Sequence, residues 1–325
     1  MQPPQIPAIP PSTLQLWIEG AAFFGAGGSY NVPFLLPGLG GPYTSFNPQN
    51  GFEFAFGADY RPQGTPYHYV FDFRYGRTGT ATGNASGSSF STTTTSSLGP
   101  FFISTQTITD TNSSASQVTR KWEDHLVADL MVGRDIGIGS NRPELLFGIR
   151  VADLHASASA LLNSQTNTTT TIIRTFKTDS VFFAVPTNTT VTSSTTTQSI
   201  FARWNSRFFG AGPRVNLTGT APIAGAWSFE YSGGVAALFG DRSIGINVLT
   251  NNIGVSALYS EPALIMNADA IAALSYAFTP HYKITAGLRA DYYNTAIKTY
   301  DVNTGGFVNV DRLFWGPFVR LTGSF

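Results

Sequence analysis

The most restrictive feature of the sequence is a pair of strictly alternating segments, residues 51–60 and 67–75. Every second position holds an aromatic or apolar side chain, and the positions between them are mostly acids, bases, histidine and glycine. The apolar set is Phe52, Phe54, Phe56, Ala58, Tyr60, Tyr67, Tyr69, Phe71, Phe73 and Tyr75. A period of two residues is that of a β-strand. The intervening segment Arg61–Pro66 has the composition of a turn, so the sequence predicts a β-hairpin with one aromatic face.

Two folds are compatible with such a hairpin. In a soluble sandwich the polar face is exposed, whereas in a membrane barrel it faces the lumen and tyrosines near the strand ends form interfacial girdles. Aromatic residues make up 14% of the chain and charged residues only 12%, against about a quarter in typical soluble domains. The sequence has no apolar run long enough for a transmembrane helix, and a closed barrel is the other structure that satisfies its backbone in lipid. The aromatic density therefore favours a lipid-facing surface.

The same pattern recurs along the chain. An opening strand is predicted at residues 14–24, a closing strand at 313–325, and further hairpins at 126–151, 209–239 and 270–292. Short connections fall near residues 61–66, 134–143, 218–225 and 279–281, and long ones near 25–50, 76–120, 156–203, 240–265 and 294–311. Long outer loops alternating with short inner turns are typical of outer-membrane barrels. The sequence therefore predicts an all-β fold, a transmembrane antiparallel up-and-down β-barrel of about ten strands. Strands hidden in the long loops, for example around residues 172–185, would raise the count to about twelve.

Two of the long connections are dominated by serine, threonine, glycine and asparagine. They are residues 76–120, which include Ser88–Ser97, and residues 156–199. Segments of this composition cannot bury enough apolar surface to form a core. Loops of this length are also uncommon inside compact domains. We therefore predict that both tracts are external loops.

The last residues of the chain, Leu313–Phe325, alternate in the same way and end on a phenylalanine. A terminal aromatic residue on such a strand resembles the closing strand of bacterial outer-membrane barrels, where it is the recognition signal for assembly. The residues predicted to carry this signal are Trp315, Phe318, Leu321 and Phe325. The expected location is the bacterial outer membrane, and the expected partners are its lipid bilayer and the barrel assembly machinery.

Residues 1–13 are rich in proline, which cannot pair within a sheet interior, and we predict an extended lead-in to a barrel spanning residues 14–325. The opening lacks the basic and apolar regions of a signal peptide, so an exported form is expected to be mature with an added Met, or a fragment. The absence of cysteine excludes a thiolate metal site. Basic and acidic residues number 19 each, which argues against a nucleic-acid partner.

Four short motifs resemble a known family. They are Leu16–Gly20, Phe147–Arg150, Arg207–Arg214 and Trp315–Leu321. In these motifs the chain resembles the pore-forming outer-membrane proteins typified by the Legionella major outer membrane protein. The resemblance covers the barrel strands and not the threonine-rich loops. It implies a porin through which ions or small polar solutes diffuse passively, and no cofactor is expected.

The alternation also places a set of ionisable side chains on the predicted inner faces. They are Glu53, Asp59, His68, Asp72, Arg74, Asp129, Arg150, Arg214, Glu230, Lys283, Arg289, Asp291 and Arg320. A lumen lined by both signs of charge could set a transverse field that tunes ion selectivity. The same residues could instead pair with one another and fill the interior, because only larger barrels leave an aqueous channel. Inner glycines such as Gly57, Gly210 and Gly234 either relieve strain in bent strands or open space along the lumen. The residues leave both interpretations open, and the family resemblance favours the pore.

Other function classes have weaker support. Asp153 and His155 share a strand face, but no further group converges on them, and the sequence lacks Gly-Xaa-Ser-Xaa-Gly and His-Glu-Xaa-Xaa-His. We therefore predict no enzymatic activity and no metal site. The main alternative to the porin is a non-conducting structural or adhesive barrel that acts through its Ser/Thr-rich loops, and a soluble β-sandwich is the third. A charge-paired lumen favours the alternative, and a continuous polar path favours the pore.

Overall fold

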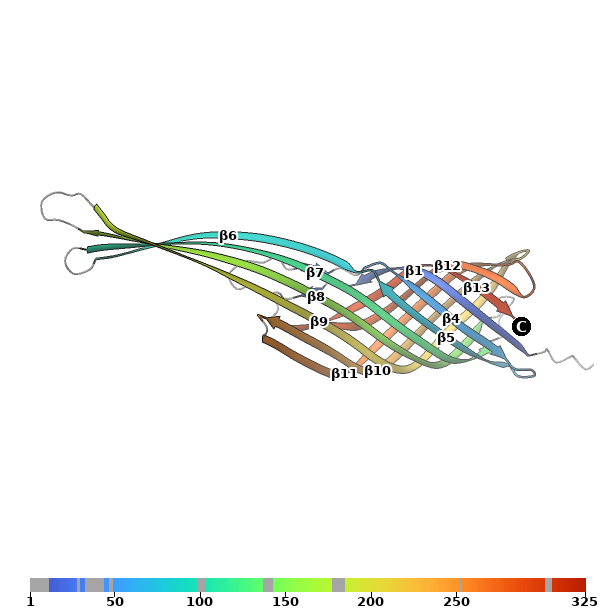
Figure 1. Ribbon diagram of the computed structural model, residues 1–325. Helices are drawn as coiled ribbons and strands as arrows, with labels where there is room; N and C mark the ends of the chain where they lie inside the picture. The colour runs from blue at the N-terminus through green and yellow to red at the C-terminus, as the bar shows by residue number, and fades with distance from the viewer. Residues whose placement is uncertain are drawn as a thin grey trace, which may run out of the picture.

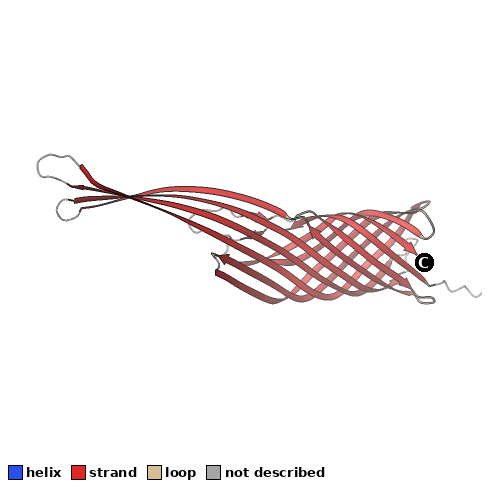
Figure 2. Cartoon of the chain, viewed as in Figure 1, coloured by secondary structure: helices blue, strands red, loops and turns tan. Residues whose placement is uncertain are grey.

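A computed structural model describes residues 12–27, 30–32, 44–46, 49–98, 103–136, 143–176, 185–251, 253–301 and 306–325. Regular secondary structure in these ranges is entirely β-strand (Figures 1 and 2). None of the described residues belongs to a helix that is long and apolar enough to cross a membrane. Most of the proline-rich lead-in, residues 1–11, lies outside the described residues.

Ten strands close into an antiparallel barrel, because β5 pairs with β4 on one side and with β7 on the other. Around the ring they are β1 (Thr13–Gly27), β4 (Gly51–Arg61), β5 (Tyr67–Thr78), β7 (Ile103–Asp135), β8 (Glu144–Phe176), β9 (Val185–Ala224), β10 (Trp227–Thr250), β11 (Ile253–Ala277), β12 (Tyr282–Asp301) and β13 (Gly306–Ser324). Among the described strands, β6 (Ala81–Leu98) pairs with β7 alone, and β2 (Tyr30–Val32) and β3 (Thr44–Phe46) form a separate hairpin. The predicted fold class, an up-and-down antiparallel barrel of about ten strands, is confirmed.

The predicted closing strand seals the ring. β13 pairs with β1, and reciprocal backbone hydrogen bonds join the start of β1 to the last residue, Phe325. The Leu14 amide donates to the Phe325 carbonyl at 3.0 Å, and the Phe325 amide donates to the Leu14 carbonyl at 2.8 Å. Trp315, Leu321 and Phe325 are exposed on the outer face. Phe318, which the sequence grouped with them, is buried inside the barrel. Phe318 is an odd number of residues away from Trp315, Leu321 and Phe325, so its side chain points to the opposite face of the strand.

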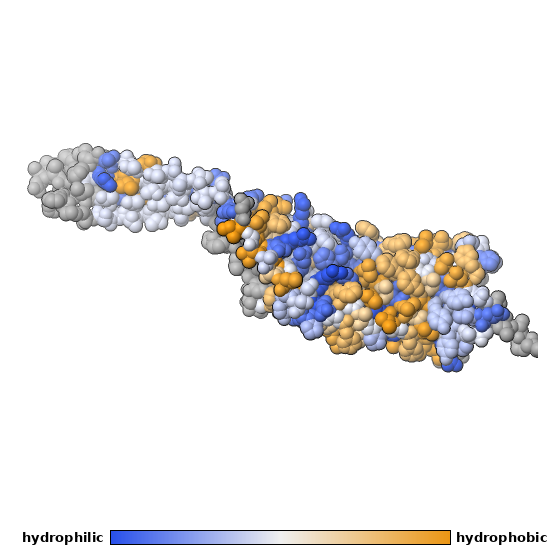
Figure 3. Space-filling model, turned by 60° about the horizontal axis from the view of Figure 1, so that its bottom comes forward, coloured by the Kyte–Doolittle hydropathy of each residue, from blue (hydrophilic) through white to orange (hydrophobic). Residues whose placement is uncertain are grey.

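The outer face of the barrel is apolar. Outward positions hold exposed aromatic and aliphatic side chains, among them Ile18, Phe54, Phe71, Leu130, Ile149, Val215, Phe229, Leu274, Leu288 and Val319. Together they form the apolar belt, which gives the barrel part of Figure 3 its orange colour. At the short-turn end the belt finishes in aromatic pairs, such as Trp227 and Tyr276, whose ring centroids lie 4.9 Å apart. At the other end the charged residues Asp124, His155 and Arg207 share one outward cross-strand row. Exposed apolar residues, among them Val118, Leu161 and Phe201, form a further outward row closer to the arm.

The Ser/Thr-rich tracts are strands, and here the structure differs from the predicted loops. β6 to β9 continue past the end of the barrel as a four-stranded sheet, the arm, which comprises residues 86–98, 103–116, 163–176 and 185–199. Figures 1 and 2 show the arm projecting far beyond the barrel at the end opposite the C-terminus. Threonine favours strands, and the ladder uses backbone groups that every residue except proline supplies, so a low-complexity composition does not prevent pairing.

The other connections refine the predicted boundaries. Of the strand predicted near residues 172–185, residues 172–176 form the end of β8 and Val185 begins β9, both in the arm, and residues 177–184 lie outside the described residues. Residues 240–265 lie almost entirely in β10 and β11. β9 runs to Ala224, and the third short turn is therefore Gly225–Ala226. Gly225 has a φ of 57°, in the left-handed region that glycine adopts without steric cost.

The inner glycines make room for neighbouring side chains. A Cβ atom added at Gly57 would lie 2.2 Å from the Trp17 ring, and one at Gly210 would lie 2.4 Å from the Phe208 ring. At Gly234 the Arg214 guanidinium occupies the space at 2.8 Å. The room left by these three glycines is thus filled by packing and does not widen a channel.

Candidate functional site

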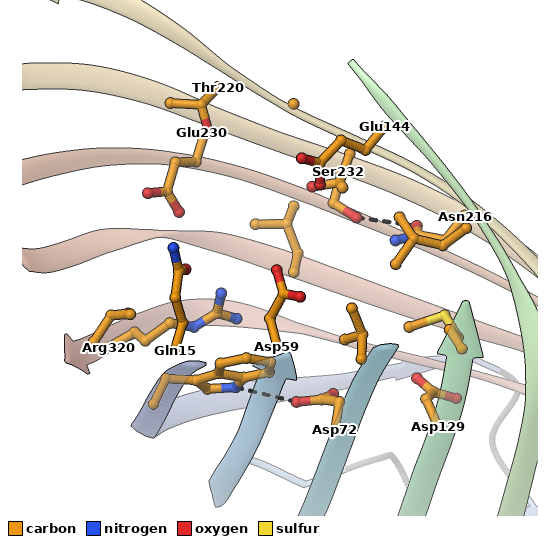
Figure 4. A pocket seen from close by; sticks show the side chains of 18 of the residues that line it. Gln15, Asp59, Asp72, Asp129, Glu144, Asn216, Thr220, Glu230, Ser232 and Arg320 are labelled. Atoms are coloured by element: carbon orange, nitrogen blue, oxygen red, sulfur yellow. Dashed lines mark hydrogen bonds between the residues drawn. The ribbon is translucent and has the colours of Figure 1, made fainter. Parts of the chain in front are cut away.

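A cup of about 510 Å³ lies inside the barrel at the short-turn end (Figure 4). Its ionisable lining residues are Asp59, Arg61, His68, Asp72, Arg74, Asp129, Glu144, Arg150, Arg214, Glu230, Asp269, Lys283, Arg289 and Arg320. Figure 4 shows carboxylates of several strands directed into this space, with the Trp17 indole donating to Asp72 at 3.3 Å. The cup therefore brings together both signs of charge from most of the ring.

The rim of the cup is an ion-paired cluster of four residues. His68 Nδ1 lies 2.7 Å from Asp59 Oδ1, and its Nε2 lies 3.5 Å from Glu144 Oε2. Arg61 donates to Asp59 at 3.0 Å and to Glu144 at 2.8 Å. The two carboxylates are thus shared by one guanidinium and one imidazole, which ties β4, β5 and β8 together at this end.

The floor of the cup is a layer of buried ion pairs. On one side Arg150, fully buried, donates to both carboxylate oxygens of Asp129 at 2.7 Å and to Asp269 at 3.1 Å. Arg214 also donates to both oxygens of Asp269, one of them at 2.8 Å. Two guanidinium groups and two carboxylates therefore form one hydrogen-bonded network across β7, β8, β9 and β11.

On the opposite side the layer continues through Arg289 and Arg74. Arg289 donates to Glu53 at 2.7 Å and to Glu19 at 3.1 Å, and Arg74 donates to Asp291 at 2.6 Å. These five side chains are buried and come from β1, β4, β5 and β12. Arg150 Nη1 lies 3.8 Å from Asp291 Oδ1, which links the two halves. The network therefore spans the interior from one wall to the other.

Towards the arm the interior becomes apolar. A buried cluster fills this part of the barrel: Phe23, Val127, Leu154, Phe208, Leu238, Ile265, Tyr293 and Phe314 belong to it. The His125 ring stacks on Phe314 with centroids 4.6 Å apart and contacts Glu53 through Nε2 at 2.7 Å. The imidazole thus connects the charged layer to the apolar layer above it.

A second group of charges lies beyond the apolar belt. Glu261 of β11 accepts hydrogen bonds from Lys298 at 2.6 Å, Arg242 at 3.0 Å and Tyr259 at 3.1 Å. The hydrogen bond from Lys298 is the largest cause that lowers the pKa of Glu261 from 4.5 to about 2, while desolvation acts in the opposite direction. This cluster joins β10, β11 and β12 where they leave the belt.

All the ionisable residues predicted for the inner faces lie on the inner side of the barrel. Each of them lines the cup except Glu53 and Asp291, which are buried in the layer beyond it. Glu19, His125 and Asp269 also lie on the inner side but were not among the predicted pore-lining residues. Each of them shares a strand face with inner residues at a two-residue spacing, so strict application of the period would have included them.

The catalytic candidates do not converge. Asp153 and His155 are on the outer face, where Arg207 donates to Asp153 at 2.8 Å and His155 Nδ1 lies 3.7 Å from Asp124. Across the described part of the chain, no group of three or more His, Cys, Asp and Glu residues is arranged to hold a metal ion. The outer pair is therefore part of an exposed charged row.

No family model and no curated protein matches the chain. Among solved structures it is similar to the outer membrane protease OmpT from Escherichia coli, with 13% identity, 99% of both chains covered and a TM-score of 0.39. It is also similar to the translocator domain of the autotransporter NalP from Neisseria meningitidis, with 10% identity, 96% and 88% coverage and a TM-score of 0.27. Neisserial surface protein A matches at 11% identity, with 94% and 95% coverage and a TM-score of 0.24. With TM-scores this low, the likenesses assign no activity to this chain.

Proposed function

We propose that the chain is a bacterial outer-membrane barrel with a closed interior, which anchors the arm and holds it outside the membrane. The observation that carries this proposal is the filling of the interior by two successive layers, one of buried ion pairs and one of apolar side chains. This is the non-conducting alternative considered from the sequence, with one change, because the arm takes the place of loops.

The apolar belt supports a membrane location. An exposed arginine or lysine near the bilayer midplane of such a barrel costs about 2–4 kcal/mol. The outward positions of the belt hold aromatic and aliphatic residues, with aromatic pairs at the short-turn end. Among the described residues, charged side chains on the outer face include Asp124, His155 and Arg207 near the arm and Arg134 at the short-turn end. In this orientation the start of β1 and the end of β13 face the periplasm, and the arm faces the outside.

The two inner layers support a closed interior. A hydrated ion moving from the cup would have to separate pairs such as Arg150–Asp129 and Arg289–Glu53, whose members are buried. Breaking a buried pair leaves charges uncompensated, at a cost of about 3–5 kcal/mol. The ion would then meet Phe208 and the other side chains of the apolar cluster.

Single-channel conductance in a planar bilayer tests the proposal. The detergent-refolded protein should insert without producing discrete current steps, with insertion measured separately by protease protection. Replacing Phe208 and Phe314 together by alanine removes two rings from the apolar layer and should increase leak. A matched control replaces the outward Phe54 and Phe71 by alanine, which leaves the interior intact.

The passive pore predicted from the sequence is the second candidate. The cup favours it, because about 510 Å³ of space lined by both signs of charge is open at one end of the barrel. Discrete, salt-dependent steps from the unmodified protein would support this candidate and overturn the closed interior. The cup charges Asp59, Glu230 and Lys283 would then be the first residues to substitute for an effect on ion selectivity.

A further inference from the structure

The arm has two open edges. Among the described strands, β6 pairs with β7 alone, and β10 accompanies β9 only as far as the pair Thr250–Ile200. Beyond that point, in residues 185–199, β9 pairs with β8 and with no other described strand. Backbone N–H and C=O groups therefore face outward along both sides of the arm, and such a row is a template for pairing with another strand.

Over most of their length the two edges lack the features that usually prevent such pairing; Pro186 and a shift in register with β8 lie at the far end of the β9 edge. Natural edge strands are protected by charged side chains, proline or bulges. The edge segment Ser86–Ser97 contains no charged residue and no proline, and the same is true of Asn188–Ser199. The charges of the arm lie instead on its two central strands, at Asp110 of β7 and Arg174 of β8. Charge is thus absent from the positions where it would block pairing.

The arm also lacks a covered face. Its cross-strand rows are mostly hydroxyl side chains, as in the row of Ser91, Thr111, Thr168 and Ser194. A sheet gains stability from an apolar face packed on a second layer or from more neighbouring strands. Because neither face is apolar, packing against a second layer would stabilise this sheet little, and pairing with further strands at its edges would stabilise it more.

We propose that the β6 edge of one copy pairs with the β9 edge of a second copy, so that neighbouring arms form one continuous sheet outside the membrane. This inference rests on the proposed function, because the membrane gives all copies the same orientation. β6 runs away from the barrel and β9 runs back towards it. Two arms standing side by side therefore bring an outgoing β6 against an incoming β9, and the contact is antiparallel like every pairing within the arm.

The two edges are open together over the same part of the arm. Ser86 and Ser199 lie in one cross-strand row, and Ser97 and Asn188 lie in another, so both edges are free between these rows. The β6 edge is also open closer to the barrel, from Ala81. A partner of another kind would satisfy one edge and leave the other open, whereas a second copy supplies the complement of each. Such a head-to-tail contact generates a closed ring or an extended row of copies.

The absence of cysteine from the chain makes cross-linking a direct test. One batch carries Ser91→Cys on the β6 edge, and another carries Ser194→Cys on the β9 edge. Each full-length variant is reconstituted into vesicles alone and in a mixture, then treated with a short bismaleimide. The mixture should give a cross-linked dimer, and each single variant should stay monomeric. Protease protection of the barrel, scored on the same samples, reports insertion and so separates a failure of arm pairing from a failure of the proposed membrane function.

Cross-linking of the Ser91→Cys variant with itself would overturn the proposal, because it would place two β6 edges together. A fully inserted mixture that gives no dimer, or that cross-links only to a foreign protein, would overturn it as well. A second pair of variants tests the edge contact by adding charge to it. In the cross-linking mixture, Thr93→Lys on the β6 edge should abolish the dimer, whereas Asn112→Lys on the central strand β7 adds the same charge and should retain it.

Discussion

The substitution Arg150→Met tests whether the barrel interior is packed or filled with water. The Arg150 side chain is fully buried and donates to both oxygens of Asp129 at 2.7 Å. Its other terminal nitrogen contacts Asn267 and, at 3.1 Å, Asp269. Methionine is unbranched and lacks the charge, so the change removes the pairing while most of the volume remains filled.

The expected loss of stability depends on which cations remain next to Asp129 and Asp269 after the substitution. Asp269 retains Arg214 at 2.8 Å, but the remaining cation near Asp129 is Arg214 Nε at 3.6 Å, without a hydrogen bond. Removing one partner of a buried pair costs about 3–5 kcal/mol. Because Arg214 compensates part of the charge, the expected decrease in the free energy of unfolding is about 3 kcal/mol. Adding Asp129→Asn removes the uncompensated charge and should recover part of this loss.

Arg207→Met is the matched control, because Arg207 pairs with Asp153 on the outer face and its side chain is 58% exposed. An exposed pair contributes about 0–1 kcal/mol. Urea unfolding of both variants in lipid vesicles, followed by tryptophan fluorescence, gives the two free energies. Equal losses for Arg150→Met and Arg207→Met would refute the packed interior, because only water in the lumen could screen the inner pair as effectively as the outer one.

Three further predictions follow from individual residues. Phe54→Arg places a charge on the apolar belt and should make folding into vesicles less favourable by about 2–4 kcal/mol if the site is near the midplane. Unchanged folding would contradict the assignment of this side chain to the outer face. Gly57→Val should displace the Trp17 ring, shift its fluorescence and cost about 1–3 kcal/mol. Gly20→Val is the control, since no atom lies within 4 Å of an added Cβ. The Glu261 carboxyl resonance in NMR should titrate near pH 2, and the stability from its hydrogen bonds should be complete above pH 4.5 and lost as the pH falls through about 2. A midpoint near 4.5 would exclude those hydrogen bonds.

The barrel could be predicted from the sequence because lipid and lumen impose opposite requirements on successive residues. Phe54 and Glu53 are neighbours in the chain, yet one is exposed on the belt and the other is buried in the charged layer. A period of two residues is therefore enough to place each of the predicted inner charges on its face. The pairing of those charges could not be predicted in the same way. Arg289 and Glu19 are 270 positions apart, and they meet only because the ring closes.

The arm escaped prediction for a different physical reason. Alternation identifies a strand when its two faces meet different surroundings, and in the arm both faces meet water. The row of Thr93, Thr109, Thr170 and Thr192 has the same side chain on all four strands, so no periodic signal marks it. Composition then indicated a loop, although threonine is also favoured in strands. Whether the tracts pair depends on register, which the neighbouring barrel strands impose.

This dependence on the barrel explains why a sheet without a core can exist next to a filled barrel. β7, β8 and β9 pass from the apolar belt into the arm without interruption, and their register is unbroken from the belt to the rows of Ser113 and Thr166. The packed layers of the barrel offset the entropic cost of aligning these strands. Each further row of the arm can then be stabilised by its backbone hydrogen bonds alone. A wet, flexible barrel would hold that alignment less firmly. We therefore expect the buried network around Arg150 to stabilise the alignment of the arm strands as well as the barrel.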